Sequence, residues 1–599
     1  MELPHLGFKE SKRLESQAEI LTQVSGTTTM WRSGGRVPFW GLGAALLLML
    51  CLPCQWLAAP AGGPQSGQVQ WPSKIKKALA GPDVPPQVLS FILEDRWDEA
   101  DSELSLLASS HPGDPELVTL SGVLLLLEGH LSQAQQAFER ALAIAPAFDI
   151  ARRNLAITHW HEHHNVEATS LLRLFHDKNP DDALANLYLG QAEFSEHACS
   201  PAVKAFHQAG ELLPSSPSAM FMNVVCDVQL GNVDEAEGLL KRMGPHPRLP
   251  PPSVFSFAIQ AEKSGLHQVA FLTLQLLPTD FPDSYTRAYD TALAAYETHD
   301  CVTAAKFLRH LSETGQSTPV SWDLLGNVLQ EQGVNEKKPL FVQEAYNAYR
   351  QGIYQDPHYL GNFLDIALLA LKLANYDLAG QLLTQGIRQN PQAFQLFIAR
   401  GTAQAFGGHE DVASADYQRA MELAPDDPLP PAFQGLLDIQ GGRYLQAAAT
   451  LEAGIKRSKQ PNAWLYYLLA KARYQSGEMT SENQARIREA LKEAIRLDPN
   501  LADAYGLAGL MWLKSGEYQQ AAEFFEKAHQ LDPGNSRYVF ELAKATKQKG
   551  DPASAAKYLE TFQQLEAASK PTMHAYFMRM LVTQQASPAL QETASSNLQ

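Results

Sequence analysis

The amino-acid sequence predicts an all-α protein made of about fourteen helix-turn-helix units stacked one after another. Three observations lead to this prediction: alanine, a second small residue and proline each recur at thirty-four-residue intervals between residues 81 and 569. One helix pair cannot bury its apolar face alone, whereas a stack of pairs buries a continuous core. The repetition therefore indicates one long stack rather than several unrelated domains.

The alanine column is the most regular of the three. Two lengthenings shift its frame, one of seven residues near VNEKKPLF and one of six residues around EMTSENQ. When both are allowed for, thirteen of the fourteen units carry alanine at this position. The column reads Ala100, Ala134, Ala168, Ala202, Ala236, Ala270, Ala304, Ala345, Ala379, Ala413, Ala447, Ile487, Ala521 and Ala555.

A second column, twelve residues before the first, holds Gly or Ala in eleven of the fourteen units. Its members are Gly122, Ala156, Gly190, Ala258, Ala292, Gly326, Ala367, Gly401, Gly435, Gly509 and Ala543. Two antiparallel helices approach closely only where their side chains are small. We therefore expect the two columns to mark the crossing point of the two helices in each unit.

Proline forms the third column, twelve residues after the alanine. It reads Pro112, Pro146, Pro180, Pro214, Pro282, Pro357, Pro391, Pro425, Pro499 and Pro533. Proline cannot continue a helix and disfavours helical geometry in the residue before it, so it should end each unit. Between the columns the apolar residues have helical spacing: in AQQAFERALAIAP, Ala134, Phe138 and Ala141 share a face.

This pattern resembles the tetratricopeptide repeat, a thirty-four-residue helix-turn-helix unit with a final proline. Residues 183–216 and 502–535 match it well, the latter through Tyr505, Gly509 and Phe525. The resemblance implies a right-handed solenoid, a superhelix of about fourteen repeats. It is weakest at 217–250, where prolines crowd the end of the unit, and at 462–501, which lacks both small residues. We expect any bend or break at one of these two places.

The apolar run VPFWGLGAALLLMLCLPCQWLAA, residues 37–59, is the one addressing signal, and it leaves two alternatives open. If translation begins at Met1, a long tail precedes the run, which favours an uncleaved transmembrane anchor. If it begins at Met30, a short basic segment precedes the run and small residues follow at 59–61, which favours a cleaved signal peptide. Both alternatives place the repeats outside the cytoplasm, either anchored to the membrane or periplasmic or secreted.

The expected organisation follows from these segments. Residues 1–36 form an N-terminal tail, untranslated if Met30 is the start, and 37–61 are the anchor or signal peptide. Residues 62–80, rich in Gly, Pro, Gln and Ser, are a linker. The solenoid occupies 81–569, and 570–599 supply a capping stretch and a polar, disordered tail.

Charge and cysteine content restrict the partners. The formal net charge is −17, which disfavours nucleic acid because each phosphate contact needs a Lys or Arg. The five cysteines have no spacing typical of a disulfide framework or a zinc site.

No catalytic domain fits outside the repeats and the apolar segment. The sequence has no phosphate-binding glycine loop and no nucleophile elbow, so we predict a protein that is not an enzyme and needs no cofactor. One cluster, THWHEHHNVE at 158–167, offers metal ligands, including His159, Glu162 and His163. Because it falls at the end of a first helix and in the following turn, the sequence favours solvated side chains there and no metal.

The resemblance implies that a partner would bind the inner, concave surface, which is lined by the first helices. Candidate contact residues at the fifth and ninth places of the units are Arg153, Phe221, Phe255, Tyr289, Asp323, Asn327, Tyr466 and Phe540. Lysines and asparagines that grip a terminal carboxylate in some family members are largely missing at these places. An apolar or aromatic groove for an extended segment or a helix is therefore the better expectation.

Three functions are compatible with the sequence. The favoured one is a non-enzymatic scaffold or adaptor that gathers protein partners at or outside the cytoplasmic membrane. The first alternative is a component of an export or surface-polymer assembly machine, which rests on analogy. The weaker alternative is a metal-dependent protein that uses the cluster from His159 to His164.

Overall fold

The computed structural model describes residues 71–566, apart from residues 112, 245, 246, 279, 280, 282, 283, 336, 337 and 479. The expected tail, membrane or signal segment and C-terminal stretch lie outside these residues. All regular secondary structure in the described part of the chain is helical, which confirms the all-α prediction. None of these helices is both long enough and apolar enough to cross a bilayer.

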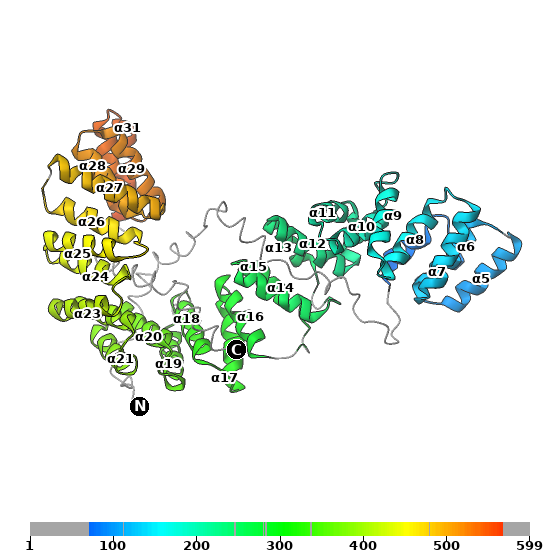
Figure 1. Cartoon of the computed structure of the whole chain (residues 1–599), viewed down its shortest axis with the longest axis horizontal. Coiled ribbons are helices and arrows are strands. Elements are labelled where there is room, and N and C mark those ends of the chain that lie inside the picture. The colour runs from blue at the N-terminus through cyan, green and yellow to red at the C-terminus, as the bar shows by residue number, and fades with distance from the viewer. Residues whose placement is uncertain are drawn as a thin grey trace. The chain divides into compact units, whose positions relative to one another are not determined.

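The described residues divide into two compact units, one from residue 71 to His310 and one from Leu311 to residue 566; Figure 1 colours the first from blue to green and the second from green to red. The boundary lies within α17 rather than at 217–250 or 462–501, where the sequence predicted a weakness.

The N-terminal unit begins with a short helix that precedes the first predicted repeat. Its helices are α3 (Ser73–Ala80), α4 (Pro86–Leu93), α5 (Trp97–Ser110), α6 (Pro115–Glu128), α7 (Leu131–Ile144), α8 (Asp149–His161), α9 (Asn165–His176), α10 (Ala183–Ser195), α11 (Cys199–Gln208), η3 (Gly210–Ser215), α12 (Pro217–Leu230), α13 (Val233–Arg242), α14 (Pro251–Lys263), α15 (His267–Leu274), α16 (Tyr285–Glu297) and α17 (Cys301–Glu313).

The C-terminal unit continues the series of pairs. Its helices are α18 (Pro319–Asn335), α19 (Pro339–Gln355), α20 (Leu360–Lys372), α21 (Tyr376–Gln389), α22 (Phe394–Phe406), α23 (Glu410–Leu423), α24 (Leu429–Gln440), α25 (Tyr444–Arg457), α26 (Ala463–Gln475), α27 (Ser481–Leu497), α28 (Ala502–Lys514), α29 (Tyr518–Leu531), α30 (Ser536–Gln548) and α31 (Pro552–Glu566).

Every predicted unit contains a first and a second helix, including the two units that match the pattern least well. The lengthenings are absorbed mainly by longer helices: α18, α19 and α27 each have 17 residues, compared with the 13 or 14 that most others have. Seven extra residues shared between α18 and α19 add about one turn to each helix, so the buried faces stay aligned.

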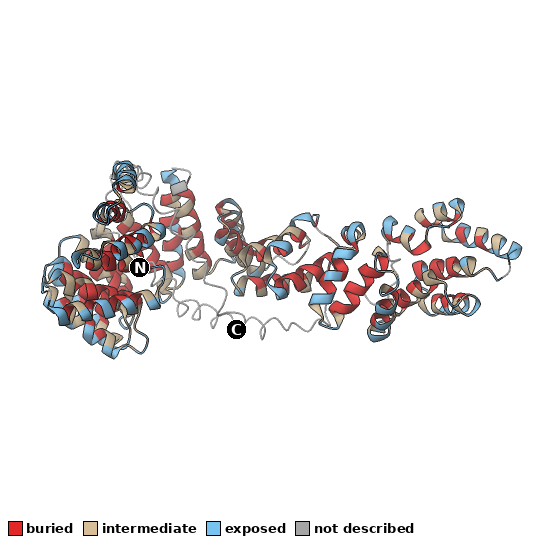
Figure 2. Cartoon of the chain, turned by 90° about the horizontal axis from the view of Figure 1, so that it is seen from above, coloured by how far each residue is buried: buried red, intermediate tan, exposed pale blue. Residues whose placement is uncertain are grey.

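The alanine column lies in the second helices and is buried throughout. Thirteen of its members are 0% exposed and Ala555 is 3% exposed, so the predicted crossing point is confirmed. Figure 2 shows the same arrangement, with buried residues on the sides of helices that face other helices and exposed residues on the outer sides.

The small residue in the first helix is explained by one particular neighbour. In six units a Cβ added to the column glycine would lie closer than 3.0 Å to a large side chain four residues after the column alanine. These pairs are Gly122 with Phe138, Gly190 with Phe206, Gly326 with Tyr349, Gly401 with Tyr417, Gly435 with Leu451 and Gly509 with Phe525. Where the first helix carries alanine instead, the partner position is always leucine: Leu172, Leu274, Leu308, Leu383 and Leu559.

Candidate functional site

The most informative surface is formed by first helices in the N-terminal unit, and a segment of the chain itself lies on it. Helix α3 contacts α6, α10 and η3, and its C-terminal end is hydrogen-bonded to α8. We call this set of contacts from α6, α8, α10 and η3 the α3-binding face. Residues 73–80 were expected to belong to a linker, but they form this packed helix.

Helix α3 has an apolar side that fits the face. Ile75 and Leu79, four residues apart and therefore on one side of the helix, are 5% and 0% exposed. Eight residues are too few for a stable helix in water, because nucleation costs more than so short a helix regains. The order of α3 therefore depends on the contacts that the repeats supply.

The C-terminal end of α3 is held by two polar side chains of α8. The last carbonyls of any helix lack partners within it and carry a partial negative charge. Arg153 Nη2 donates to the carbonyl oxygens of Ala78 and Leu79 at 2.8 and 3.3 Å, and Asn154 Nδ2 donates to the Leu79 oxygen at 3.0 Å. These two side chains thus complete the end of a helix that is not their own.

Arg153 is fixed in place from the other side as well. Its Nη1 donates to Asp182 Oδ2 at 2.9 Å, while Asp182 Oδ1 accepts from the backbone of Ala185 and caps α10. The Arg153 side chain is 7% exposed. This arginine was predicted to contact a partner, and in this structure its contact is with α3.

The N-terminal end of α3 rests on aromatic side chains. Trp71 packs edge-on against His161, with ring centroids 5.0 Å apart, and His161 Nε2 lies 3.2 Å from the Tyr188 hydroxyl. Burial lowers the pKa of His161 to about 4, helped by the nearby His163, so the imidazole is neutral near pH 7. Burial also raises the pKa of Tyr188, so its hydroxyl keeps its proton and can donate to the imidazole.

Lys76, next to the apolar side of α3, attaches this helix to the first repeat. Its side chain is buried, and its Nζ lies 2.5 Å from Asp95 Oδ1 and 5.3 Å from the centroid of the Trp97 ring. The next residue, Lys77, is exposed. Two adjacent lysines that look alike in the sequence therefore have different environments.

The other aromatic candidates in the N-terminal unit differ in exposure. Phe221 is 0% exposed and packs edge-on against Phe257 at 5.4 Å. Phe255 and Tyr289 are half-buried; Phe255 contacts Phe281 at 5.7 Å and Tyr289 stacks on Tyr285 at 5.5 Å. Only the half-buried rings keep surface that a partner can reach.

The candidates Asp323 and Asn327 of α18 are brought together by a residue that sequence reasoning missed. Asn327 Nδ2 donates to Asp365 Oδ2 of α20 at 2.8 Å, and the Tyr359 hydroxyl donates to Asp323 Oδ2 at 3.2 Å. Burial and, next, the Asp365 carboxylate raise the pKa of Asp323 well above its ordinary value. The network therefore consists of the carboxyl groups of Asp323 and Asp365, which accept hydrogen bonds from the uncharged side chains of Tyr359 and Asn327.

The last two candidates lie farther along the C-terminal unit. Tyr466 of α26 is half-buried. Phe540 of α30 is 42% exposed and contacts Phe562 at 5.2 Å between ring centroids. As partner contacts all eight candidate residues remain predictions; Phe540 is the most accessible of them, and Phe221 is fully buried in this structure.

The histidine cluster is more compact than the sequence suggested. His159 and Glu162 lie at the end of α8, and His164 precedes α9. Their ligand atoms all lie within 4.8 Å of one another. The His159 and Glu162 side chains are 16% and 12% exposed, so the expected solvated turn is in fact largely buried there.

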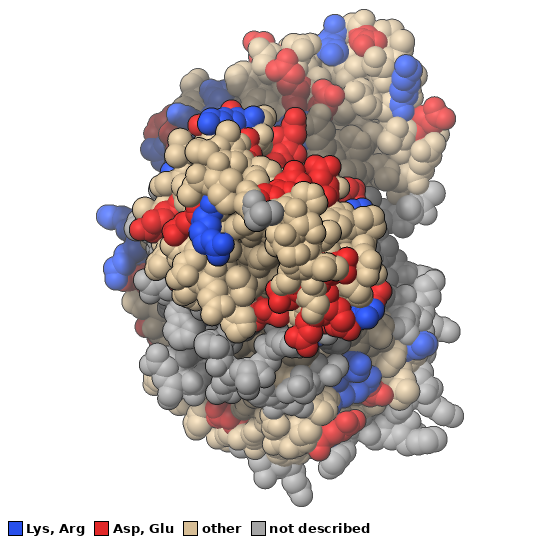
Figure 3. Space-filling model, turned by 90° about the vertical axis from the view of Figure 1, so that its right-hand side faces the viewer, with Lys and Arg blue, Asp and Glu red and all other residues tan. Residues whose placement is uncertain are grey.

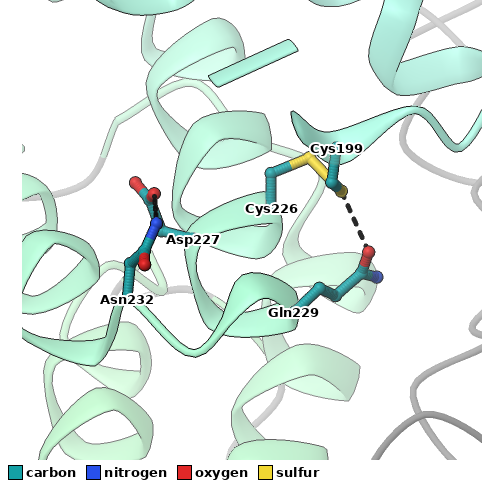
Figure 4. Close-up of a disulfide and its surroundings, with 5 residues drawn as sticks. All are labelled: Cys199, Cys226, Asp227, Gln229 and Asn232. Atoms are coloured by element: carbon teal, nitrogen blue, oxygen red, sulfur yellow. Dashed lines mark hydrogen bonds between the residues drawn. A yellow bond between two sulfur atoms is a disulfide. The ribbon is translucent and has the colours of Figure 1, made fainter. Parts of the chain in front are cut away.

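The structure also joins two cysteines that their spacing did not connect. Cys199 begins α11 and Cys226 lies on the following helix, α12; their Sγ atoms form a disulfide with a Cα–Cα distance of 4.9 Å (Figure 4). The Cys199 Sγ also lies 2.9 Å from Gln229 Oε1. The disulfide ties the second helix of one repeat to the first helix of the next.

Charge on the molecular surface agrees with the composition. On the face shown in Figure 3, Asp and Glu side chains form several patches with fewer Lys and Arg side chains between them. An acidic surface of this kind suits protein partners better than a phosphate backbone.

Comparison with known proteins identifies the repeats at the C-terminal end. Two tetratricopeptide repeat models match residues 483–536 and 513–573. A TPR repeat-containing protein of Treponema pallidum (strain Nichols) is 28% identical over 225 residues. That match covers 36% of this chain and 25% of the relative, so the chain spans about a quarter of the relative's length.

The chain also resembles several solved structures in the arrangement of its helices. Yeast Tom70 is 16% identical, with 80% of this chain and 99% of that chain covered and a TM-score of 0.37. The Cut9 and Hcn1 hetero-tetramer of the APC/C is 15% identical, with 80% and 98% covered and a TM-score of 0.34. By the two models that match its sequence, residues 483–573 of this chain contain tetratricopeptide repeats.

Proposed function

We propose that this chain is a non-enzymatic scaffold that binds short helices or extended segments of other proteins on the first-helix faces of its repeats. The observation that supports it is the docking of α3: one such face already holds an eight-residue helix by its apolar side and its C-terminal carbonyls. A surface that orders one short helix has the groups needed to order another.

The chemistry of the face defines the partner segment. It should carry two apolar residues four positions apart, as Ile75 and Leu79 are in α3. Its C-terminal carbonyls, or a terminal carboxylate in the same place, would meet Arg153 and Asn154. An aromatic residue before the helix would take the place of Trp71 against His161. This is helix-in-groove recognition with a polar stop at one end.

Further contacts on the same kind of face would enlarge the interface. Phe255, Tyr289, Tyr466 and Phe540 keep accessible ring surface, and rings contribute much area for little loss of side-chain entropy. We propose them as secondary contact residues. Arg153 would act only on a partner that takes the place of α3.

The location of the chain is a second part of the proposal. The apolar run at 37–59 supports a membrane anchor or a signal peptide, and the Cys199–Cys226 disulfide supports an oxidising compartment, where such bonds persist. Both observations favour repeats outside the cytoplasm. Membership of an export or surface-polymer assembly machine is the alternative within the same location.

A peptide with the α3 sequence tests the binding proposal. Fluorescein-labelled WPSKIKKALAG, residues 71–81, is titrated with the full chain and with a full-chain variant carrying Ile75→Asp and Leu79→Asp. The variant should release its own α3 and bind the peptide. The unmodified chain should bind it about 100-fold more weakly if the peptide dissociation constant is ~10 μM, because the tethered α3 competes at an effective concentration of ~1 mM.

Two controls make the outcome specific. A peptide with the Leu79→Asp change should not bind the opened chain, and Arg153→Met in that chain should weaken binding of the normal peptide about ten-fold. Circular dichroism should show the same helix content in all full-chain proteins, apart from the eight residues of α3 in the opened variants. If the opened chain is folded but binds no peptide, α3 is only a structural cap and the scaffold proposal loses its support.

The location is tested in the source cells. Cysteines are alkylated after acid trapping, and intact-mass analysis should show Cys199 and Cys226 oxidised. The N-terminus found in the same analysis, within residues 1–61 or near Gly62, separates an anchored chain from a cleaved one. Two free thiols at these positions would contradict the extracytoplasmic location.

A further inference from the structure

We propose that the turn between α8 and α9 binds one divalent transition-metal ion, with Zn²⁺ as the expected metal and His159, Glu162 and His164 as its ligands. The three ligands are different residues from those that contact α3, and the sequence alone favoured solvated side chains here rather than a metal.

The three side chains place suitable donor atoms around one point. The His159 Nδ1 to Glu162 Oε2 distance is 3.7 Å, and the His164 Nδ1 to Glu162 Oε2 distance is 3.5 Å. Zinc bonds of about 2.0–2.1 Å in tetrahedral geometry separate two ligand atoms by about 3.3–3.4 Å. Shifts of a few tenths of an ångström in side-chain position would therefore complete these two edges of a zinc site.

Two of the donor atoms are buried without any hydrogen-bond partner. His159 Nδ1 and Glu162 Oε2 both lack accessible surface and a bonded neighbour in the structure. Burying a carboxylate oxygen that accepts no hydrogen bond costs free energy of folding, and so does burying an imidazole nitrogen without a hydrogen-bond partner. A cation between them would satisfy both atoms. Two imidazoles and one carboxylate form a ligand set that suits zinc, with water in the fourth position.

The backbone of the turn brings His164 to the other two ligands. His163 has a positive φ of 63°, which reverses the chain directly after Glu162. The His164 amide then donates to the His159 carbonyl oxygen at 2.9 Å, so the two histidines are adjacent. Their rings lie 5.8 Å apart between centroids.

The next repeat shows that this turn does not itself require such residues. Thirty-four residues later the equivalent positions are Glu193, Glu196 and Ala198, and His197 again has a positive φ. There Glu193 accepts two hydrogen bonds of 2.6 Å from Arg173 and is thereby satisfied. The same turn therefore forms without two histidines, and of these two turns the one at 159–164 has buried His159 and Glu162 atoms without a hydrogen-bond partner.

Metal titration of the full chain tests the site. The protein is treated with EDTA, dialysed into metal-free buffer and titrated with Co²⁺, whose visible absorption reports tetrahedral coordination, and then with Zn²⁺ by calorimetry. We expect one ion per chain in the unmodified protein. Glu162→Gln and His164→Ala should each lower the affinity at least ten-fold, and the triple change with His159→Ala should abolish the visible cobalt absorption.

His163→Asn is the matched control, since asparagine tolerates a positive φ and the position is not a ligand. It should bind cobalt as the unmodified chain does. Hydrogen exchange supplies a local readout: added Zn²⁺ should slow exchange of the His163 and His164 amides in the unmodified and control chains but not in the triple variant. Equal cobalt absorption in the triple variant would place the ion at other histidines and overturn the proposal, as would the absence of any bound ion.

Discussion

Glycine pairs with an aromatic ring in five units and with Leu451 in one, and alanine pairs with leucine; this leads to a quantitative prediction for the repeat at 183–216. A Cβ added to Gly190 would lie 2.5 and 2.6 Å from two atoms of the Phe206 ring, whereas ordinary contacts begin near 3.4 Å. Phe206 is 0% exposed, so the ring cannot move toward solvent by the required ångström and neighbouring core residues would have to shift with it.

Two opposing contributions to the stability of the Gly190→Ala variant can be estimated. Overpacking a dense core costs about 1–3 kcal/mol, while alanine is favoured over glycine in a helix by about 0.8–1.0 kcal/mol. Gly190→Ala should therefore destabilise this repeat by roughly 0–2 kcal/mol. Phe206→Leu alone should cost about 1–2 kcal/mol, because it leaves a cavity against the glycine. The double change recreates the pair found at Ala156 and Leu172, and its stability should be close to that of the unmodified chain.

Native-state hydrogen exchange of α10 and α11 in the full chain is the appropriate assay, because it gives local free energies in a protein that need not unfold as one unit. The two single changes should couple by about 1–3 kcal/mol. Gly238→Ala in α13 is the control, since a Cβ there meets nothing within 4 Å; it should stabilise that helix by about 0.5–1 kcal/mol. Additive effects at Gly190 and Phe206, within about 0.5 kcal/mol, would refute the pairing.

Three further predictions concern other contacts. Lys76→Ala should speed exchange of the α3 amides about five-fold, since its ion pair with a half-exposed carboxylate contributes roughly 1 kcal/mol, whereas exposed Lys77→Ala should leave exchange unchanged in the same measurement. Replacing Cys199 and Cys226 by serine should lower the local stability of α11 and α12 by up to about 3–4 kcal/mol, the loop entropy for 27 residues, which denaturant-dependent exchange can measure. Because the folded pKa of Asp323 is raised, its neutral form stabilises the fold fully below its ordinary value of 3.8, and this contribution is lost as pH rises from there toward the folded pKa. Urea unfolding from pH 4 to 8 should show this decline, and Asp323→Asn should reduce it.

Much of the fold could be predicted from the sequence because the repeat imposes one local rule many times. Each column alanine and its preceding small residue report the same helix crossing, so an error in one unit is corrected by the others. The exceptions show how much tolerance the rule has. Ile487 occupies the alanine position and is still 0% exposed, so this unit accommodates a larger apolar side chain there. The repeated pattern thus predicted the helix pairs, but it did not predict which side chains pack against each other at every crossing.

The candidate site was less predictable because its contacts join residues far apart in the chain. The spacing of the first helices placed Asp323 and Asn327 on one face, but Asp365 comes from the next repeat and completes their network. Cys199 and Cys226 likewise meet only because successive helices are adjacent in space. Which residues of neighbouring repeats contact each other depends on how their side chains are oriented, and the spacing of residues in the sequence does not give this.

Helix α3 shows why a surface predicted to bind partners must also be examined for an occupant from the same chain. Periodicity identified Arg153 as a residue on a binding face, and that prediction depended only on its place in the repeat. The segment that reaches Arg153 lies about seventy-five residues earlier, in a stretch whose composition suggested a linker. Its two large apolar residues are too few to signal a helix, and the helix forms because α4, α6, α10 and η3 pack against it and α8 hydrogen-bonds to its end. A partner for this face must therefore bind more tightly than a tethered competitor, whereas a partner for Phe540, which is 42% exposed, meets no such competition from α3.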